Sequence, residues 1–409
     1  MMALRNRTTF VLVGVPALLC FSFACATSDD VAAGSRAPDE EGASLLDGGA
    51  ERGDVSVADA STEDVDAGRS VCSKDGFCFT TVPIPKPLVA VSAASVDDAW
   101  MLAESSAVLL HWDGSSLKQR YEYAGTSPGS ITFVSLWAEK KDDVWALANG
   151  SDGRFVLVRY SSPGPGEPPT FRELPTDVAS KVVSAVWGTP DGDALWVATQ
   201  GNSLLRIREE SGAAIVDTFA PPNGSYYWMG IWGFGPNDIY LAGGDPSRGV
   251  IVHYDGAEWS VFQTNTALVS SLRGTPPGGE RQLWYHHASP QPSGNTTQTS
   301  LVPVTADGGL GPPIYTHLMN PGPACSSRIG HASSSTAWFS DGVLLCRWDG
   351  DFEPVSTSLD GRLVVDSVNA IWSSDRDDVW VVGAAVTSGG MPAKGFAARR
   401  TAATSKGGQ

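Results

Sequence analysis

The chain has 409 residues, of which 45 are acidic and 28 basic, and the resulting net charge of −17 at pH 7 argues against a nucleic-acid partner. Its 45 glycines and 27 prolines supply frequent turns, and a hydrophobic content of 42% is sufficient for a large core. We therefore predict one large all-β body built from short strands.

Residues 1–26 have the features of a secretory signal peptide. Arg5 and Arg7 form a basic start, an apolar run from Phe10 to Phe23 follows, and small residues flank Cys25. The apolar run is shorter than the roughly 20 residues that a membrane-spanning helix needs. We therefore predict that the chain is exported, with no permanent transmembrane helix in this segment.

Two processing outcomes are compatible with this signal. The residues Ser22-Phe23-Ala24-Cys25 resemble the lipobox of bacterial lipoproteins, which implies a lipid on Cys25 and attachment to the outer membrane or cell surface. Cleavage after Ala26 would instead give a secreted or periplasmic protein. We expect lipidation, and hence contact with the membrane only through the lipid, because the next segment has the composition of a tether.

Residues 27–71 are rich in Asp, Glu, Ala, Gly and Ser and contain no aromatic residue. Such a segment cannot bury enough apolar surface to offset the entropy lost on ordering, so we predict a disordered acidic linker. An acidic binding tail is the alternative. We expect a folded body at 72–403 and a second disordered tail at 404–409.

The body repeats a unit of four short strands. In the clearest copy we predict these strands, with turn-forming residues between them, at 229–232, 239–242, 250–254 and 259–263. One aromatic after the first turn aligns seven units: Trp100, Trp145, Trp196, Tyr240, Trp284, Trp338 and Trp380. Their spacing, from 42 residues (338 to 380) to 54 (284 to 338), is typical of four-stranded propeller blades.

Several positions recur together in these units. They include Ile231-Trp232-Gly233, Asn237-Asp238-Ile239-Tyr240-Leu241-Ala242-Gly243, His253-Tyr254-Asp255-Gly256 and Trp259. The pattern resembles the repeat of secreted bacterial β-propeller proteins related to the Asp-box type, over about residues 89–403. This resemblance implies a seven-bladed β-propeller of four-stranded antiparallel blades. Units five and six depart from the pattern, with Arg273 and Gly330 where the first tryptophan is expected.

The resemblance does not extend to sialidase chemistry. A true Asp-box has serine or threonine two residues before the aspartate, where this chain has His111, His253 or Arg347. Arg159 occupies the same repeat position in another unit. Because the position accepts both histidine and arginine, we interpret it as structural.

The two ends of the body suggest how the ring closes. The seventh unit offers three strands, at 368–372, 379–383 and 395–400, whereas residues 77–84 resemble a fourth strand placed before the first unit. Closure removes the open strand edge that would otherwise invite aggregation. We therefore predict that the N-terminal strand completes the last blade.

Four cysteines remain outside the signal region, an even number that suits an exported protein: Cys72, Cys78, Cys325 and Cys346. They allow three pairings. Proximity in the sequence favours Cys72 with Cys78 and Cys325 with Cys346. A zinc site is the rival interpretation, but neither the two-residue cysteine spacing nor a paired histidine motif is present.

Histidines and aspartates are the candidate metal ligands. His286-His287 lie in one unit, near His317 and His331, and paired aspartates precede several of the aligned aromatics at 97–98, 142–143 and 377–378. The histidines are interpreted as strand-end residues, and the aspartates as residues that stabilise their own turns. The dense aspartate loop of calcium motifs is missing. We expect no metal and no cofactor.

No nucleophile elbow, phosphate loop or zinc-protease signature occurs in the sequence. We therefore predict a non-enzymatic binding or scaffolding protein, monomeric, with an unknown protein or glycan as partner; an extracellular polysaccharide hydrolase or lyase acting in the propeller channel is the alternative. The candidate ligand-binding residues are Tyr226, Tyr227 and Trp228. Binding loops are expected at 161–170, 243–249, 289–299 and 386–394.

Overall fold

The computed structural model describes residues 71–401. It does not describe residues 105, 124–130, 163–165, 175, 177, 180, 201–202, 223–225, 246, 266–267, 276–279, 292–293, 320–327, 333–335, 360–362, 375–376 and 388–393. All regular elements in the described part are β-strands. Consequently, no helix there has the length and apolar character needed to cross a membrane.

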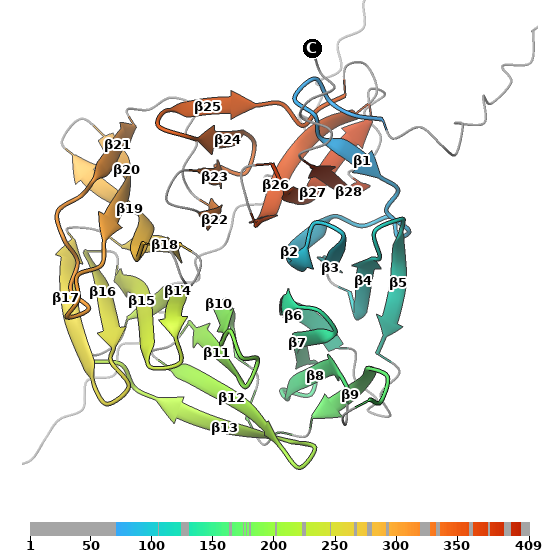
Figure 1. The fold of residues 1–409 in the computed structure, drawn as a ribbon, viewed down its shortest axis with the longest axis horizontal. Coiled ribbons are helices and arrows are strands. Elements are labelled where there is room, and N and C mark those ends of the chain that lie inside the picture. The colour runs from blue at the N-terminus through green and yellow to red at the C-terminus, as the bar shows by residue number, and fades with distance from the viewer. Residues whose placement is uncertain are drawn as a thin grey trace, which may run out of the picture. The chain divides into compact units, whose positions relative to one another are not determined.

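The strands form seven four-stranded antiparallel sheets arranged in a ring, as Figure 1 shows. Blades 1 and 2 consist of β2 (Leu88–Ser95), β3 (Asp98–Ala103), β4 (Val108–Trp112), β5 (Leu117–Glu122), β6 (Ile131–Lys140), β7 (Asp143–Gly150), β8 (Phe155–Ser161) and β9 (Thr170–Leu174). Blades 3 and 4 consist of β10 (Val183–Gly188), β11 (Ala194–Thr199), β12 (Leu204–Glu210), β13 (Ala213–Phe219), β14 (Tyr227–Gly235), β15 (Asp238–Asp245), β16 (Arg248–Tyr254) and β17 (Trp259–Asn265).

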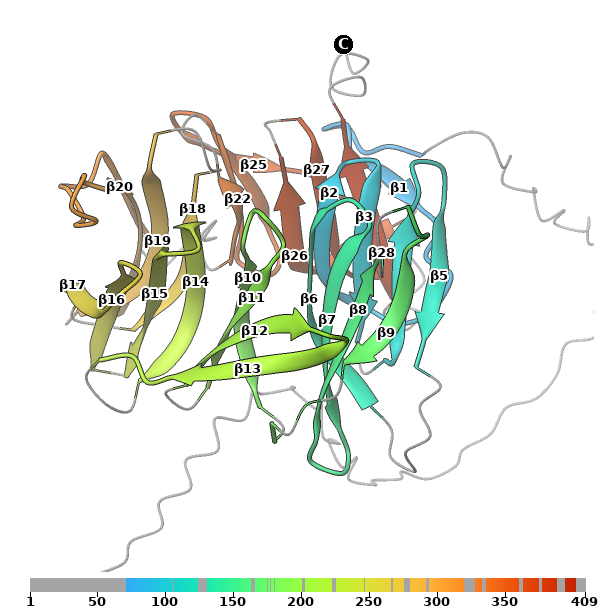
Figure 2. The ribbon, with the colours of Figure 1, turned by 60° about the horizontal axis from the view of Figure 1, so that its bottom comes forward.

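Blades 5 and 6 consist of β18 (Val269–Gly274), β19 (Gln282–Gln291), β20 (Gly294–Pro303), β21 (Tyr315–Met319), β22 (Arg328–Ala332), β23 (Ala337–Ser340), β24 (Leu345–Trp348) and β25 (Phe352–Val355). Blade 7 consists of β26 (Leu363–Ser373), β27 (Val379–Thr387), β28 (Lys394–Arg400) and β1 (Cys78–Thr80). The predicted seven-bladed β-propeller is therefore confirmed. In the view of Figure 1, the first strands of the blades lie on the inner side of the ring, and Figure 2 shows the same ring tilted.

The predicted closure of the ring is also confirmed. Strand β1 pairs with β28 as the outermost strand of blade 7, with Cys78 opposite Arg399 and Thr80 opposite Ala397. The chain therefore begins and ends its folded body in the same sheet. This pairing leaves the last blade without the open edge that β28 would otherwise present.

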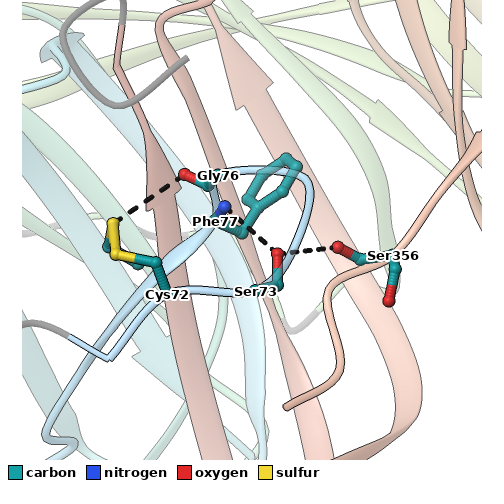
Figure 3. Close-up of a disulfide and its surroundings, with 6 residues drawn as sticks. Cys72, Ser73, Gly76, Phe77 and Ser356 are labelled. Carbon is teal, nitrogen blue, oxygen red and sulfur yellow. Dashed lines mark hydrogen bonds between the residues drawn. A yellow bond between two sulfur atoms is a disulfide. The ribbon is translucent and has the colours of Figure 1, made fainter. Parts of the chain in front are cut away.

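A disulfide-bonded hairpin precedes β1 and fastens the N-terminal strand to blade 6 (Figure 3). Cys72 and Cys78 form a disulfide, as their proximity in the sequence predicted. Inside the hairpin, the Ser73 hydroxyl donates a hydrogen bond to the Ser356 carbonyl, with an Oγ–O distance of 2.9 Å, and accepts one from the Phe77 amide. Phe77 is fully buried and packs edge-on against Trp338 of blade 6, with 5.7 Å between the ring centroids.

Two of the predicted loops are wrong. Residues 243–249 are mostly strand, because β15 runs to Asp245 and β16 starts at Arg248. Residues 289–299 likewise belong largely to the long β19–β20 hairpin. At residues 243–249 the glycines permit strand pairing and do not interrupt it. A Cβ on Gly244, whose φ is +140°, would overlap the Arg248 carbonyl.

Tryptophans at the ends of the first strands pack against glycines of the following blade. A Cβ built on Gly188 would overlap the indole of Trp137, and one on Gly233 would overlap the indole of Trp187. Gly274 lies against Trp232 in the same way. The Trp-Gly pairs of the repeat therefore have a steric cause, because each glycine makes room for the tryptophan of the blade before it.

We expect Gly233→Ala to destabilise the protein by about 1–3 kcal/mol, because Trp187 is only 2% exposed and has no room to move away. Gly235→Ala is the matched control on the same strand, since its Cβ would meet nothing within 4 Å. Urea unfolding of both variants measures the difference. Equal stability of the two variants would contradict the steric explanation.

Candidate functional site

The centre of the ring contains a cavity of about 340 Å³ that is lined by the first strands of the blades. Each first strand has at least one β-bulge, and one bulge residue of each strand lines the cavity: Val89, Val134, Ser184, Met229, Ser270, Gly330 and Asn369. A bulge redirects the side chain of its extra residue. The cavity volume lies in the range of small-molecule sites, about 300–1,000 Å³.

Several polar groups around the cavity are occupied by contacts within the fold. The Ser184 hydroxyl bonds to the carbonyl of Trp228 in the next blade. The Asn369 amide donates to the Leu88 carbonyl at 2.9 Å and so connects blade 7 to blade 1. Ser92 accepts a hydrogen bond from the Ala138 amide, which connects blades 1 and 2. These contacts hold neighbouring blades together at the inner end of the ring.

The charge of the cavity wall comes from one residue. Of the described side chains that line the cavity, only that of Arg273 carries a charge at neutral pH, and none is a carboxylate or an imidazole. Arg273 is half-buried on β18 and lies opposite Trp284 of β19 in the strand register. Its place in the sheet is taken by Trp137, Trp187, Trp232 and Trp372 in other blades. The sequence shows this departure from the repeat, but it does not indicate a role for Arg273.

Blade 5 also differs from the other blades in its core. The difference lies in the second strand, two residues after the aligned aromatic. In blades 1, 2, 3, 4 and 7 the residue there is apolar: Leu102, Leu147, Ala198, Ala242 and Val382. In blade 5 this residue is His286, opposite Ser271. On the third strand of blade 5, Thr299 lies opposite His286. The corresponding residues of the same five blades are apolar: Leu109, Leu157, Leu204, Ile251 and Ala397. An alignment of the blades could have revealed this polar row.

His286 is neutral at physiological pH. Burial and the neighbouring His287 lower its pKa to about 4, and its Nδ1 lies 3.0 Å from the Thr299 hydroxyl. Both histidines are buried in β19, so they are not the exposed strand-end residues that the sequence suggested. His317 lies on β21 opposite Thr299, and His331 lies on β22.

The repeated histidine and arginine positions are structural, as predicted. His111 stacks on Trp100 and lies 2.8 Å from the Asp98 carboxylate, and His253 makes the same arrangement with Tyr240 and Asp238. In blade 2 an arginine replaces the histidine. Arg159 stacks over Trp145, and its Nε and Nη2 atoms each donate a hydrogen bond of 3.1 Å to the Asp143 carboxylate.

The remaining paired aspartates serve similar contacts. Asp97 pairs with Arg399 and Asp377 with Arg400, at 2.9 and 3.1 Å. Asp142 has a positive φ of 56° in its turn. Asp255 accepts hydrogen bonds from the amides of Glu258 and Ala257, which lower its pKa. No group of three or more potential ligands among the described residues is arranged to hold a metal ion.

The three candidate binding aromatics have different environments. Trp228 is fully buried and Tyr226 is 8% exposed, and their rings pack edge-on at 6.0 Å. Tyr227 is 51% exposed at the start of β14. Its backbone bridges to Gln200, whose amide in turn bonds to the carbonyl of the exposed Val182. Only Tyr227 of the three can therefore offer its ring to a ligand without rearrangement.

Four of the six exposed large apolar side chains among the described residues lie at one end of the ring, which we call the start face because the first strand of each blade begins there. Val182 and Tyr227 lie at the starts of β10 and β14, and Val364 lies at the start of β26. Val343 belongs to the β23–β24 turn, which antiparallel pairing places at the same end. The start face thus offers both apolar and aromatic surface.

Two predicted covalent sites involve cysteines that the structure does not describe. Cys25 and Cys325 lie outside the described residues. Cys346 is buried on β24. Lipidation of Cys25 and the pairing of Cys325 with Cys346 therefore stay predictions.

Comparison with known proteins identifies the fold only. No family model matches the chain, and no curated protein matches it. Among solved structures, it is similar to a streptogramin B lyase at 13% identity and a TM-score of 0.53, over 79% of this chain and 97% of that one. YCF48 bound to a D1 peptide matches at 12% identity and 0.52, over 80% and 95%.

The β-propeller domain of Cps50 (Swd1) from Myceliophteria thermophila matches at 13% identity and a TM-score of 0.52, over 80% of this chain and 99% of that domain. At these identities the likeness shows a shared propeller fold. It does not assign an activity, because the same fold carries unrelated functions.

Proposed function

We propose that this chain is an exported, monomeric binding protein that recognises a protein or glycan partner outside the cytoplasm and has no catalytic activity of its own. The observation that carries the proposal is the composition of the central cavity. Its described lining includes neither a carboxylate nor a histidine, and these are the groups on which glycoside hydrolysis and general acid–base chemistry rely. Arg273 can bind an anion but cannot serve as a proton acceptor.

The start face supplies the proposed contact surface for the partner. Tyr227 and Val182 are joined there through Gln200, and both side chains are more than half exposed. Exposed aromatic residues are enriched at protein interfaces, and they also stack on sugar rings. Two structural neighbours, a lyase and a protein bound to a peptide, have roles that the same fold can host, and the cavity composition favours binding here.

We further propose that a lipid on Cys25 holds the protein at the outer membrane or cell surface, with residues 27–71 as its tether. The lipobox resemblance and the acidic, aromatic-free composition of the tether support this proposal. The intact mass of the mature protein distinguishes a lipid on Cys25 from an unmodified N-terminus at Thr27. The latter result would leave export standing and remove the anchor.

The binding proposal is tested with the full chain in a glycan and surface-protein screen, run beside turnover assays on the same glycans. For any partner found, Tyr227→Ser should weaken binding at least tenfold without loss of stability, because the ring is exposed. Val343→Ser is the control, since it is exposed at the same face in blade 6. Turnover by the wild-type chain would overturn the non-catalytic proposal.

A further inference from the structure

Blade 5 differs from its neighbours where it meets the central cavity, and the differences lie on one face of the sheet. Ser271 and Arg273 are two residues apart on β18, so their side chains leave the same face. His286 lies opposite Ser271, and Thr299 lies opposite His286. A continuous polar row therefore leads from the cavity wall into the blade. Breaks in an otherwise consistent repeat are expected at functional positions.

Arg273 determines the electrostatic character of this corner. It replaces the tryptophan that blades 2, 3, 4 and 7 have at this position, and Gly330 of blade 6 also lines the cavity. His286 is neutral, and the described lining includes no acidic side chain. A guanidinium offers five donors in a planar fork that matches the geometry of a carboxylate.

The rest of the wall restricts the body of a ligand. Met229 and Ile371, which are partly exposed, and Ile329 give the cavity an aliphatic side. The Ser271 hydroxyl adds a hydrogen-bonding group to this lining. The cavity volume of about 340 Å³ suits one small molecule or one terminal unit of a larger one.

We infer that the central cavity is a binding site for a small molecule that bears a carboxylate, with the carboxylate on Arg273 beside Ser271 and the body against the aliphatic wall. The inference goes beyond the proposed contact of a partner with the start face, because it assigns a separate site in the cavity. Two sources can supply this chemistry, an acidic sugar unit and an aliphatic carboxylic acid, and both present a planar anion on a compact body.

Isothermal titration calorimetry on the full chain tests the inference, with galacturonate and hexanoate as probes and galactose and hexanamide as their uncharged counterparts. At least one acid should bind, and its counterpart should bind at least tenfold more weakly. Preference for galacturonate assigns an acidic sugar, and preference for hexanoate assigns an aliphatic acid. Absence of binding by both acids to the folded chain would overturn the inference.

Variants locate the site. Arg273→Gln should weaken binding of the preferred acid at least tenfold, whereas Arg273→Lys should lose less because it keeps the charge but not the planar fork. Met229→Trp should block the cavity without changing its charge. Arg206→Gln is the control, since Arg206 pairs with Asp217 on the outer strands of blade 3. Thermal melts confirm that each variant is folded.

Unchanged affinity in a folded Arg273→Gln variant would place the anion elsewhere and overturn the inference. The proposed function fails separately, through turnover or through the absence of any partner in the screen. A further outcome is that a macromolecular partner binds wild type and Arg273→Gln equally while neither acid binds to the chain. In that case the binding proposal stands and the carboxylate site is excluded.

Discussion

Phe77→Ala is expected to destabilise the propeller by about 3–5 kcal/mol, the cost of truncating a fully buried aromatic. Phe77 contributes to the core between blades 6 and 7, where it packs with Trp338, Val381 and Phe396. Its loss should also weaken the attachment of β1, which is only three residues long. The variant therefore tests whether ring closure depends on this buried side chain as well as on strand pairing.

Urea unfolding measures the effect, and Phe79→Ala is the matched control on β1, because Phe79 is only partly buried against Phe396. We expect a clearly smaller loss for the control. Reduction of the Cys72–Cys78 disulfide should cost wild type about 2 kcal/mol in the chain-entropy model for so short a loop. Equal losses from the two phenylalanine variants would show that Phe77 is not the anchor of the closure.

The architecture was predictable because its determinants are local and repeated. The aromatic of each second strand and the turn before it recur at a blade-length spacing, and residues 77–84 supply the strand that the seventh unit lacks. The loop predictions at 243–249 and 289–299 failed because their composition is that of turns. Pairing between β19 and β20 extends through Ser289, Pro290 and Gln291, so tertiary context overrides local preference there.

The candidate site was less accessible from sequence. Trp228 had no counterpart in the template and was therefore proposed as a ligand-binding residue. The register shows that it is a core residue, because it lies opposite Gly243, which has no side chain to occupy the same space. In the same way, the bulges that build the cavity wall depend on a one-residue offset between strands, and no single strand sequence encodes that offset visibly.

The polar row of blade 5 needed the register as well. His286 was noticed as one of four histidines and not as the occupant of a column that is otherwise apolar. Only the pairing of β18 with β19 shows that it shares a sheet face with Arg273. The departure of Arg273 from the tryptophan pattern was visible, but its meaning depended on the cavity beside it.

Acidification from pH 7 to pH 4.5 is expected to destabilise the protein through His286. Its pKa is about 4 in the folded state, against an ordinary value of 6.5. Between these values the unfolded chain binds a proton that the folded chain does not, so stability is complete above about pH 6.5 and falls as the pH is lowered. At about 1.4 kcal/mol per unit, the loss approaches about 3 kcal/mol near pH 4.

Urea unfolding at several pH values between 4.5 and 7 measures this slope in wild type and two variants. His286→Leu, which introduces the residue that blades 1 and 2 have at this position, should flatten the slope because it removes the titrating group. Thr299→Val should lower stability at every pH while keeping the slope, since it removes only the partner of the imidazole. Asp255 is an example of a carboxylate with a lowered pKa, and the stability that it contributes is lost only at pH values below the range from 4.5 to 7. If His286→Leu keeps the full wild-type slope, another group must be responsible for the acid sensitivity.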